Sequence, residues 1–250
     1  MDFVRVSIEQ GIAEVRLERG KVNALDDRLV EELSICFRQL AEDPAVRGSV
    51  LTGAGKFFSF GFDIPHFLAY PRERFAEFLR RFTALYQDLF AHPKPVVAAI
   101  NGHAVAGGCM LATACDARIM VGGKAKIGLN EIGFGSSVFA GSVAILRFWV
   151  GGRRAQEILY GGSLYSAEEA QALGLVDRVV TEDGLMEAAR LTAGQHAAKD
   201  PAAFRGIKQL LRQPVIEDMI AREATSIGEF VETWYSERTR QNLHEIKIHA

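Results

Sequence analysis

Two short segments contain the residues best suited to chemistry. Thr52–Ile64 (T-G-A-G-K-F-F-S-F-G-F-D-I) and Asn101–Met110 (N-G-H-A-V-A-G-G-C-M) each end an apolar run at glycines. In the second segment Gly107 and Gly108 lead straight into a helix-like pattern, so the first backbone N–H groups of that helix have no partner within it. Such groups attract negative charge, and glycine lets a loop approach a ligand closely. Two such sites facing each other are predicted to hold one oxyanion, such as the negative charge that develops on a carbonyl oxygen when a neighbouring proton is removed.

Composition and charge exclude several classes of function. The chain has 250 residues, 48% of them apolar, which is enough for a sizeable core. Its 29 Lys and Arg against 31 Asp and Glu leave a net charge of −2, so no charge excess indicates nucleic acid or a membrane surface as a partner. The three cysteines, Cys36, Cys109 and Cys115, and the histidines show no metal-ligand spacing, and we predict no metal site. The N-terminus lacks the apolar core of a signal peptide, and we expect a cytoplasmic protein.

Apolar periodicity predicts alternating strands and helices in the first 150 residues. Residues 4–17 alternate polar and apolar on both sides of a Gln-Gly pair, which predicts a hairpin with one face in water. Asp26 is expected to cap a helix that ends before Pro44. Residues 118–129 are predicted to form a second hairpin, around Gly122-Gly123. The further predicted elements are strands at 48–52 and 96–105 and helices at 75–90, 107–115 and 140–150. This alternation is typical of an α/β fold.

The second part of the chain is predicted to be mostly helical. One short strand at 175–180 interrupts the helices, and Ser166 with Glu169 forms a capping-box pattern. The predicted helices span 153–160, 166–173, 184–199, 201–212 and 215–237. No Pro-, Ser- or Gly-rich linker divides the chain, so we predict an α/β core over 1–190 with a helical C-terminal extension over 191–250. Apolar faces left over on that extension are expected to form a subunit interface.

Several segments, taken in order, resemble the crotonase family, the enoyl-CoA hydratase/isomerase group, over nearly the whole chain. They are N-A-L at 23–25, K-F-F-S-F-G-F-D-I at 56–64, P-K-P-V-V-A-A-I-N-G-H-A-V-A-G-G-C at 93–109, C-D-A-R-I-M at 115–120, I-G-L-N-E at 127–131 and A-E-E-A-Q-A-L-G-L-V-D-R-V-V at 167–180. The resemblance implies a spiral of repeated ββα units assembled as trimers or dimers of trimers. It also implies acyl-CoA thioester substrates, in which coenzyme A is part of the substrate and no separate cofactor is needed.

Individual catalytic residues follow from the resemblance. The residue before Gly61, which is Phe60, matches the family's first oxyanion N–H, and Gly107 matches the second. Three residues after Gly107, hydratases of the family place a glutamate, but this chain has Met110. The family's second catalytic glutamate is matched by Glu131. One base over one oxyanion hole predicts a proton shuttle that moves a double bond, as in the 3,2-trans-enoyl-CoA isomerases that these motifs are similar to.

The resemblance also implies where the substrate binds. Backbone groups at Ala24 and Leu25 are expected to bind coenzyme A, and Lys56 is the best-placed basic side chain for its phosphates. Asp63 is also suited to cap the turn after Gly61. The further residues predicted at the substrate site are Ser59, Gly61, Phe62, Asp63, Met110, Asn130 and Phe134.

Other functions stay open from the sequence. The same oxyanion hole could serve hydration with Glu131 alone, thioester hydrolysis or decarboxylation. A protein that kept the fold and lost catalysis would bind the CoA thioester without exchanging protons. Product analysis separates these alternatives from isomerisation.

Overall fold

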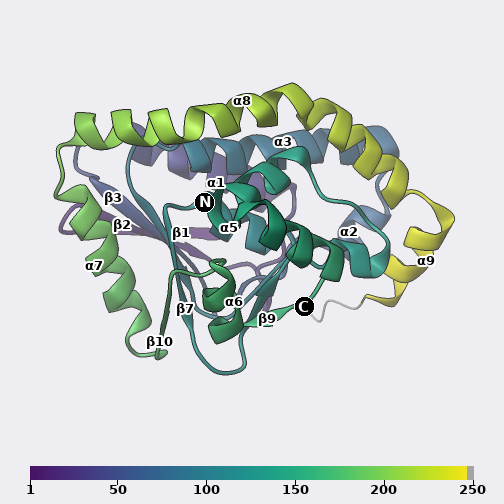
Figure 1. The fold of residues 1–250 in the computed structure, drawn as a ribbon, viewed down its shortest axis with the longest axis horizontal. Coiled ribbons are helices and arrows are strands. Elements are labelled where there is room, and N and C mark those ends of the chain that lie inside the picture. The colour runs from purple at the N-terminus through teal and green to yellow at the C-terminus, as the bar shows by residue number, and fades with distance from the viewer. Residues whose placement is uncertain (247–250) are drawn as a thin grey trace.

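The computed structural model describes residues 1–246, which form two sheets with helices packed on and between them (Figure 1). One sheet has six strands in the order β1-β2-β3-β5-β7-β10, and the other has four in the order β4-β6-β8-β9. Within them only β1–β2 and β8–β9 pair antiparallel. The strands are β1 (Val4–Glu9), β2 (Ile12–Leu17), β3 (Gly48–Gly53), β4 (Phe57–Ser59), β5 (Val96–Ile100), β6 (His103–Val105), β7 (Ala117–Val121), β8 (Lys126–Gly128), β9 (Tyr165–Ser166) and β10 (Arg178–Val180). The α/β prediction is confirmed.

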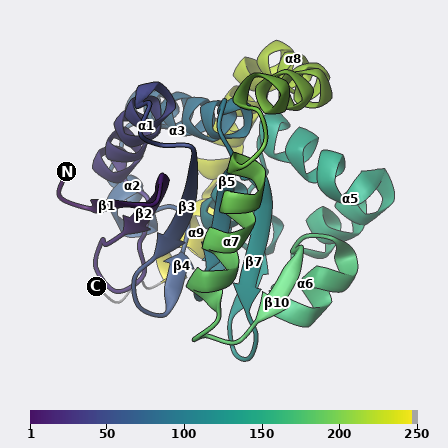
Figure 2. The same cartoon turned by 90° about the vertical axis from the view of Figure 1, so that its left-hand side faces the viewer.

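The helices cover the sheets and continue into a helical C-terminal region. They are α1 (Asp27–Glu42), α2 (Ile64–Leu68), α3 (Arg72–Ala91), α4 (Gly107–Ala114), α5 (Ala140–Gly161), α6 (Ala167–Leu173), α7 (Leu185–Ala197), α8 (Pro201–Trp234) and α9 (Glu237–Glu245), with a 3₁₀ turn η1 (Glu131–Phe134). Helix α7 packs against β3, β5 and β7 on one face of the larger sheet (Figure 2), and α4 contacts strands of both sheets. The boundary predicted at residue 190 falls inside α7. Residues 247–250, the end of the predicted C-terminal region, lie outside the described residues.

Side-chain caps account for several helix starts. Asp26 Oδ1 accepts from Leu29 N at 2.9 Å, as predicted. Ser166 Oγ accepts from Glu169 N at 3.3 Å while Glu169 Oε2 accepts from Ser166 N at 2.7 Å, which is the predicted capping box. These caps could be predicted from the sequence because each joins residues only three positions apart.

The first hairpin forms, but its apolar side chains are not all buried. In β2 the alternating apolar residues lie in the core, whereas in β1 Val6 is 41% and Ile8 is 47% exposed. Strand β1 is the edge of the larger sheet, so fewer elements cover it.

The predicted second hairpin is wrong. Strand β7 pairs with β5 and β10 in the larger sheet, whereas β8 pairs with β6 and β9 in the smaller one, so the Gly122-Gly123 segment connects two sheets. The apolar run 96–105 likewise divides into β5 and β6. Between them, the Asn101 side chain accepts from Gly53 N at 2.9 Å and donates to Gly55 O at 3.0 Å. The chain therefore changes sheets at points where apolar periodicity continues without a break.

The predicted helices at 140–150 and 153–160 are confirmed as the two halves of α5, which are separated by a kink at Gly151, whose φ of 77° is not helical. The next predicted pair is instead continuous in the structure. Helix α8 runs through Pro214 for 34 residues, although proline removes a backbone hydrogen bond. After α8 the chain turns at Ser236 and forms the separate helix α9.

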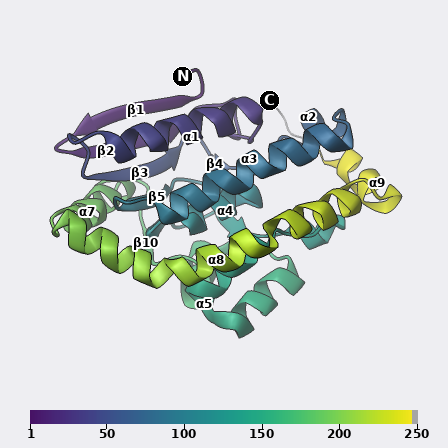
Figure 3. The same ribbon diagram turned by 90° about the horizontal axis from the view of Figure 1, so that it is seen from above.

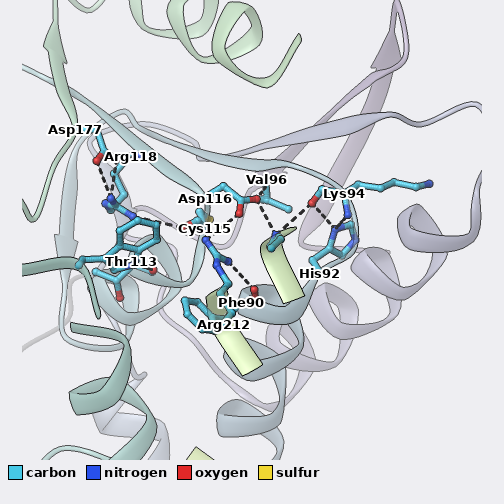
Figure 4. A network of polar contacts seen from close by, with 12 residues as sticks. Phe90, His92, Lys94, Val96, Thr113, Cys115, Asp116, Arg118, Asp177 and Arg212 are labelled. Atoms are coloured by element: carbon cyan, nitrogen blue, oxygen red, sulfur yellow. Dashed lines mark hydrogen bonds and ion pairs between the residues drawn. The ribbon is translucent and has the colours of Figure 1, made fainter. Parts of the chain in front are cut away.

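Helix α8 lies across α3 and α5 (Figure 3), and a buried charge cluster attaches its first half to the larger sheet (Figure 4). Asp116, directly before β7, accepts from Lys208 Nζ at 2.8 Å and lies 2.9 Å from Arg212 Nη2. Its carboxylate also accepts from Val96 N at 2.7 Å, and Arg212 donates to Phe90 O at 2.6 Å. The Lys208 and Arg212 side chains are 7% and 5% exposed, so this carboxylate balances two buried cations.

Within residues 1–246 no helix is long and apolar enough to cross a membrane. No group of three or more His, Cys, Asp or Glu side chains in that part of the chain is arranged to hold a metal ion.

Candidate active site

The loop that follows β4 carries one backbone donor of the site, but not at the residue predicted. The Phe60 N–H donates to Val22 O at 2.9 Å, so it is already paired and the prediction that it stabilises an oxyanion is wrong. Around Phe62 the loop forms a parallel bridge with Leu25, in which Leu25 N donates to Gly61 O at 2.7 Å and Asp63 N donates to Leu25 O at 3.0 Å. In such a bridge the N–H of the central residue points away from the partner segment. Among the described residues the Phe62 N–H has no acceptor.

The same loop packs directly on the start of α4. A methyl group added to Gly61, whose φ is 95°, would lie 3.1 Å from Gly107 N and 2.8 Å from Val105 O. A methyl group added to Gly108 would lie only 2.3 Å from Ser59 O. Glycines at both positions therefore allow the two backbones to meet. The Gly107 N–H is at the start of α4, where the first N–H groups lack partners within the helix. At this contact between the two backbones, Phe62 and Gly107 therefore each offer a backbone N–H without a partner among the described residues.

Glu131 is the first residue of η1 and is 4% exposed. Its Oε2 atom has no hydrogen-bond partner among the described residues. Burial raises the pKa of Glu131 to about 8, because the carboxylate loses its hydration. A carboxyl group in this environment is suited to take up and return a proton near neutral pH.

A narrow cavity of about 50 Å³ brings these groups together. It is lined by Phe60, Phe62, Ile64, Val105, Ala106, Gly107, Met110, Asn130, Glu131, Phe134, Phe139, Phe230, Trp234 and Ile246. Seven residues of the predicted site are among them, namely Phe60, Phe62, Gly107, Met110, Asn130, Glu131 and Phe134. Among the described residues of this lining, Glu131 is the only one with an ionisable side chain.

The other predicted site residues lie outside this cavity and support the loops. The Ser59 hydroxyl is buried, donates to Asn23 O at 2.8 Å and accepts from Gly61 N at 3.1 Å. Asp63 caps α2 by accepting from His66 N, as its sequence position indicated, and it also pairs with Arg19. The Leu25 N–H is occupied by Gly61 O and is not free for coenzyme A. The remaining residues outside the lining are Ala24, Gly61 and the exposed Lys56.

The sequence analysis did not predict the side chains of the C-terminal region that line the cavity. Phe230 and Trp234, one helical turn apart near the end of α8, line it together with Ile246. The Phe230 ring stacks on Phe139, with ring centroids 4.5 Å apart. The spacing of Phe230 and Trp234 was visible in the sequence, but the same spacing is typical of any helix that packs on a core.

A family model described as "Enoyl-CoA hydratase/isomerase" matches residues 7–246. The chain belongs to this family. A probable enoyl-CoA hydratase of Bacillus subtilis is 34% identical over 239 residues, covering 93% of this chain and 92% of the relative. The mouse mitochondrial enoyl-CoA delta isomerase 1 is 30% identical over 244 residues, covering 94% and 82%. The crystal structure of human mitochondrial delta3-delta2-enoyl-CoA isomerase superposes with a TM-score of 0.92 at 27% identity, covering 97% of this chain and 96% of that one.

These relatives include enzymes named as hydratases and as isomerases, so membership of the enoyl-CoA hydratase/isomerase family alone leaves the reaction open. Met110 lies on the first turn of α4, beside Gly107, and is 3% exposed. A thioether cannot exchange a proton, so the wall formed by α4 offers no acid or base.

Proposed function

We propose that this protein is an acyl-CoA-processing enzyme that shifts the double bond of a 3-enoyl-CoA to the 2-position. One observation carries the proposal: Glu131 is the only ionisable side chain among the described residues that line the cavity. Hydration requires that a water is activated and that a proton is delivered, which is commonly divided between two groups. Isomerisation requires only that one group removes a proton and returns it.

The proposed reaction has two proton transfers. The Glu131 carboxylate removes a proton from C2 of the 3-enoyl thioester, and the electron pair moves onto the carbonyl oxygen to form a dienolate. The Phe62 and Gly107 N–H groups stabilise this oxygen, assisted by the positive end of α4. The protonated Glu131 then returns the proton to C4, the electron pair moves back, and the product is the 2-enoyl thioester. No atom is gained or lost.

The activity should depend on the ionisation of Glu131. The free enzyme needs this carboxyl group deprotonated, and burial raises its pKa to about 8. We therefore expect kcat/KM to rise about tenfold per pH unit as the pH increases toward 8, and to level off above it. Initial rates between pH 5 and 9.5 would test this. A profile that is already flat above about pH 5 would contradict the assignment, since it would require an ordinary glutamate pKa.

Product analysis tests the proposed reaction. The pure protein is incubated with 3-enoyl-CoA and with 2-enoyl-CoA thioesters of several chain lengths, and the products are identified by mass spectrometry and chromatography. We expect the 3-enoyl form to become the 2-enoyl form without 3-hydroxyacyl product. Accumulation of 3-hydroxyacyl-CoA would instead support a hydratase, free acid and coenzyme A would support a thioesterase, and binding without conversion would support a non-catalytic protein.

We further propose that the chain assembles as a trimer or a dimer of trimers through its helical C-terminal region. Support comes from apolar side chains exposed on α8, which are Ile207, Leu210, Leu211 and Ile220, at 60%, 80%, 61% and 61% exposure. Light scattering coupled to size exclusion should give three or six times the 27.5 kDa chain mass. A monomer at micromolar concentration would contradict this proposal.

Ala24 and Lys56 are proposed to contact coenzyme A.

A further inference from the structure

Helix α9 is attached to α2, one of the segments beside the cavity. At the corner between α8 and α9, Tyr235 Oη donates to Tyr70 O at 2.6 Å. One turn into α9, Arg240 Nη2 donates to Leu68 O at 3.1 Å. Helix α2 begins at Ile64, directly after the loop that carries the Phe62 N–H. The C-terminal helix is thereby held to the oxyanion side of the site, where Figure 1 shows α9 beside α2.

The same helix also holds η1, the turn that carries Glu131. Thr239 Oγ1 donates to Gly135 O at 2.7 Å, and Asn242 Nδ2 donates to Phe134 O at 3.1 Å. Both carbonyl groups lie at the end of η1, where a short helix leaves its acceptors unpaired. Helix α9 therefore spans from the segment with the oxyanion donor to the segment with the base.

The hydrogen bond from Thr239 is fixed in direction. The carbonyl oxygen of Gly135 can only accept, so the Thr239 hydroxyl uses its own hydrogen for this bond and accepts from Ser236 Oγ at 3.1 Å. Thr239 is 2% exposed, which keeps water from replacing this contact. Hydrogen bonds in such a chain polarise and strengthen one another.

A single 3₁₀ turn has poor hydrogen-bond geometry and is not rigid by itself. Proton transfer is sensitive to distance, and a displacement of about 1 Å can cost about 100-fold in rate. We propose that Thr239 and Asn242 are positioning residues, which hold Glu131 at its working distance from the oxyanion hole by fixing the end of η1. This inference rests on the proposed function, because Glu131 must act as the base.

The test compares Thr239→Val and Asn242→Ala with the wild-type protein. Val has nearly the shape of Thr without the hydroxyl, and Asn242 is only partly buried, so the second variant is expected to fold even if the first does not. We expect each change to lower kcat for 3-enoyl-CoA about 10- to 100-fold. KM should stay within about twofold, because the thioester contacts are unchanged. Thr239→Ser, which restores the hydroxyl, should recover most of the wild-type kcat.

The matched control is Thr233→Val. Thr233 lies on the neighbouring turn of α8, and its hydroxyl donates to Glu229 O within its own helix. This control should keep the wild-type kcat. If Thr239→Val and Asn242→Ala also keep it, or if they raise KM with kcat unchanged, the inference is wrong.

Amide hydrogen exchange separates this inference from the proposed function. The N–H groups of Gly133, Gly135 and Ser136 are bonded within the turn that begins at Asn130. Their exchange in Thr239→Val should be at least about tenfold faster than in Thr233→Val. A wild-type protein that isomerises no 3-enoyl-CoA would refute the proposed function. In that case, faster exchange would still support the hold of α9 on η1, whereas unchanged exchange would overturn it.

Discussion

Replacing Glu131 by Gln is expected to lower kcat for 3-enoyl-CoA isomerisation about 10²- to 10⁴-fold while leaving binding of the CoA thioester nearly unchanged. Glutamine keeps the size and shape of the side chain but cannot accept a proton at C2 or return one at C4. Burial raises the pKa of Glu131 to about 8, which means that the charged carboxylate destabilises the folded state. The neutral amide should therefore fold at least as well as the wild type. Steady-state rates and isothermal titration with a saturated acyl-CoA would measure the two effects.

The matched control for this variant is Glu182→Gln. Glu182 is exposed on the turn before α7, outside the cavity lining, so its replacement should change neither kcat nor binding. If Glu131→Gln retains the wild-type rate, Glu131 is not the base and the one-base mechanism fails.

Replacing Asp116 by Asn is expected to destabilise the folded protein by about 3–5 kcal/mol. The carboxylate of Asp116 is the partner of two nearly buried cations, Lys208 and Arg212. An amide of the same size would leave both charges buried without a counter-charge, although α8 could still pack. Thermal or urea unfolding would measure the loss, which for a chain of this length corresponds to a Tm lower by about 10 °C.

Asp218→Asn is the control for that experiment. Asp218 pairs with Arg222 one turn along α8, but both side chains are nearly half exposed, so the pair contributes less than about 1 kcal/mol. Equal losses of stability in the two variants would show that the cluster at Asp116 does not anchor α8.

The family resemblance in the sequence was sufficient to place Glu131 and Gly107 among the candidate site residues, and both line the cavity. It was insufficient for the first oxyanion donor. Phe60 and Phe62 are both N–H donors beside Gly61, and only the pairing of the loop with Val22 and Leu25 shows which of them is occupied. Hydrogen-bond register between distant segments cannot be read from either segment alone.

Two further features of the fold were predicted wrongly because they also depend on contacts between distant segments. Gly122-Gly123 has the composition of a hairpin turn, but the flanking strands find parallel partners in separate sheets, which is a property of the whole fold. Pro214 indicated a helix boundary, yet packing on α3 and α5 keeps α8 continuous through it. The placement of Trp234 over the cavity depends on that continuity. The contribution of α8 to the cavity lining could therefore not be predicted from local sequence patterns.

In the proposed reaction, Glu131 carries a single proton from C2 to C4. The most direct measurement follows a 3-enoyl-CoA deuterated at C2 through early turnover in ordinary water, with the label in the 2-enoyl product located by mass spectrometry and NMR. Because the carboxyl group is buried, we predict that part of the deuterium is found at C4. Release of all the label to water at the earliest measurable conversion, or formation of 3-hydroxyacyl-CoA in place of the isomer, would contradict the one-base mechanism.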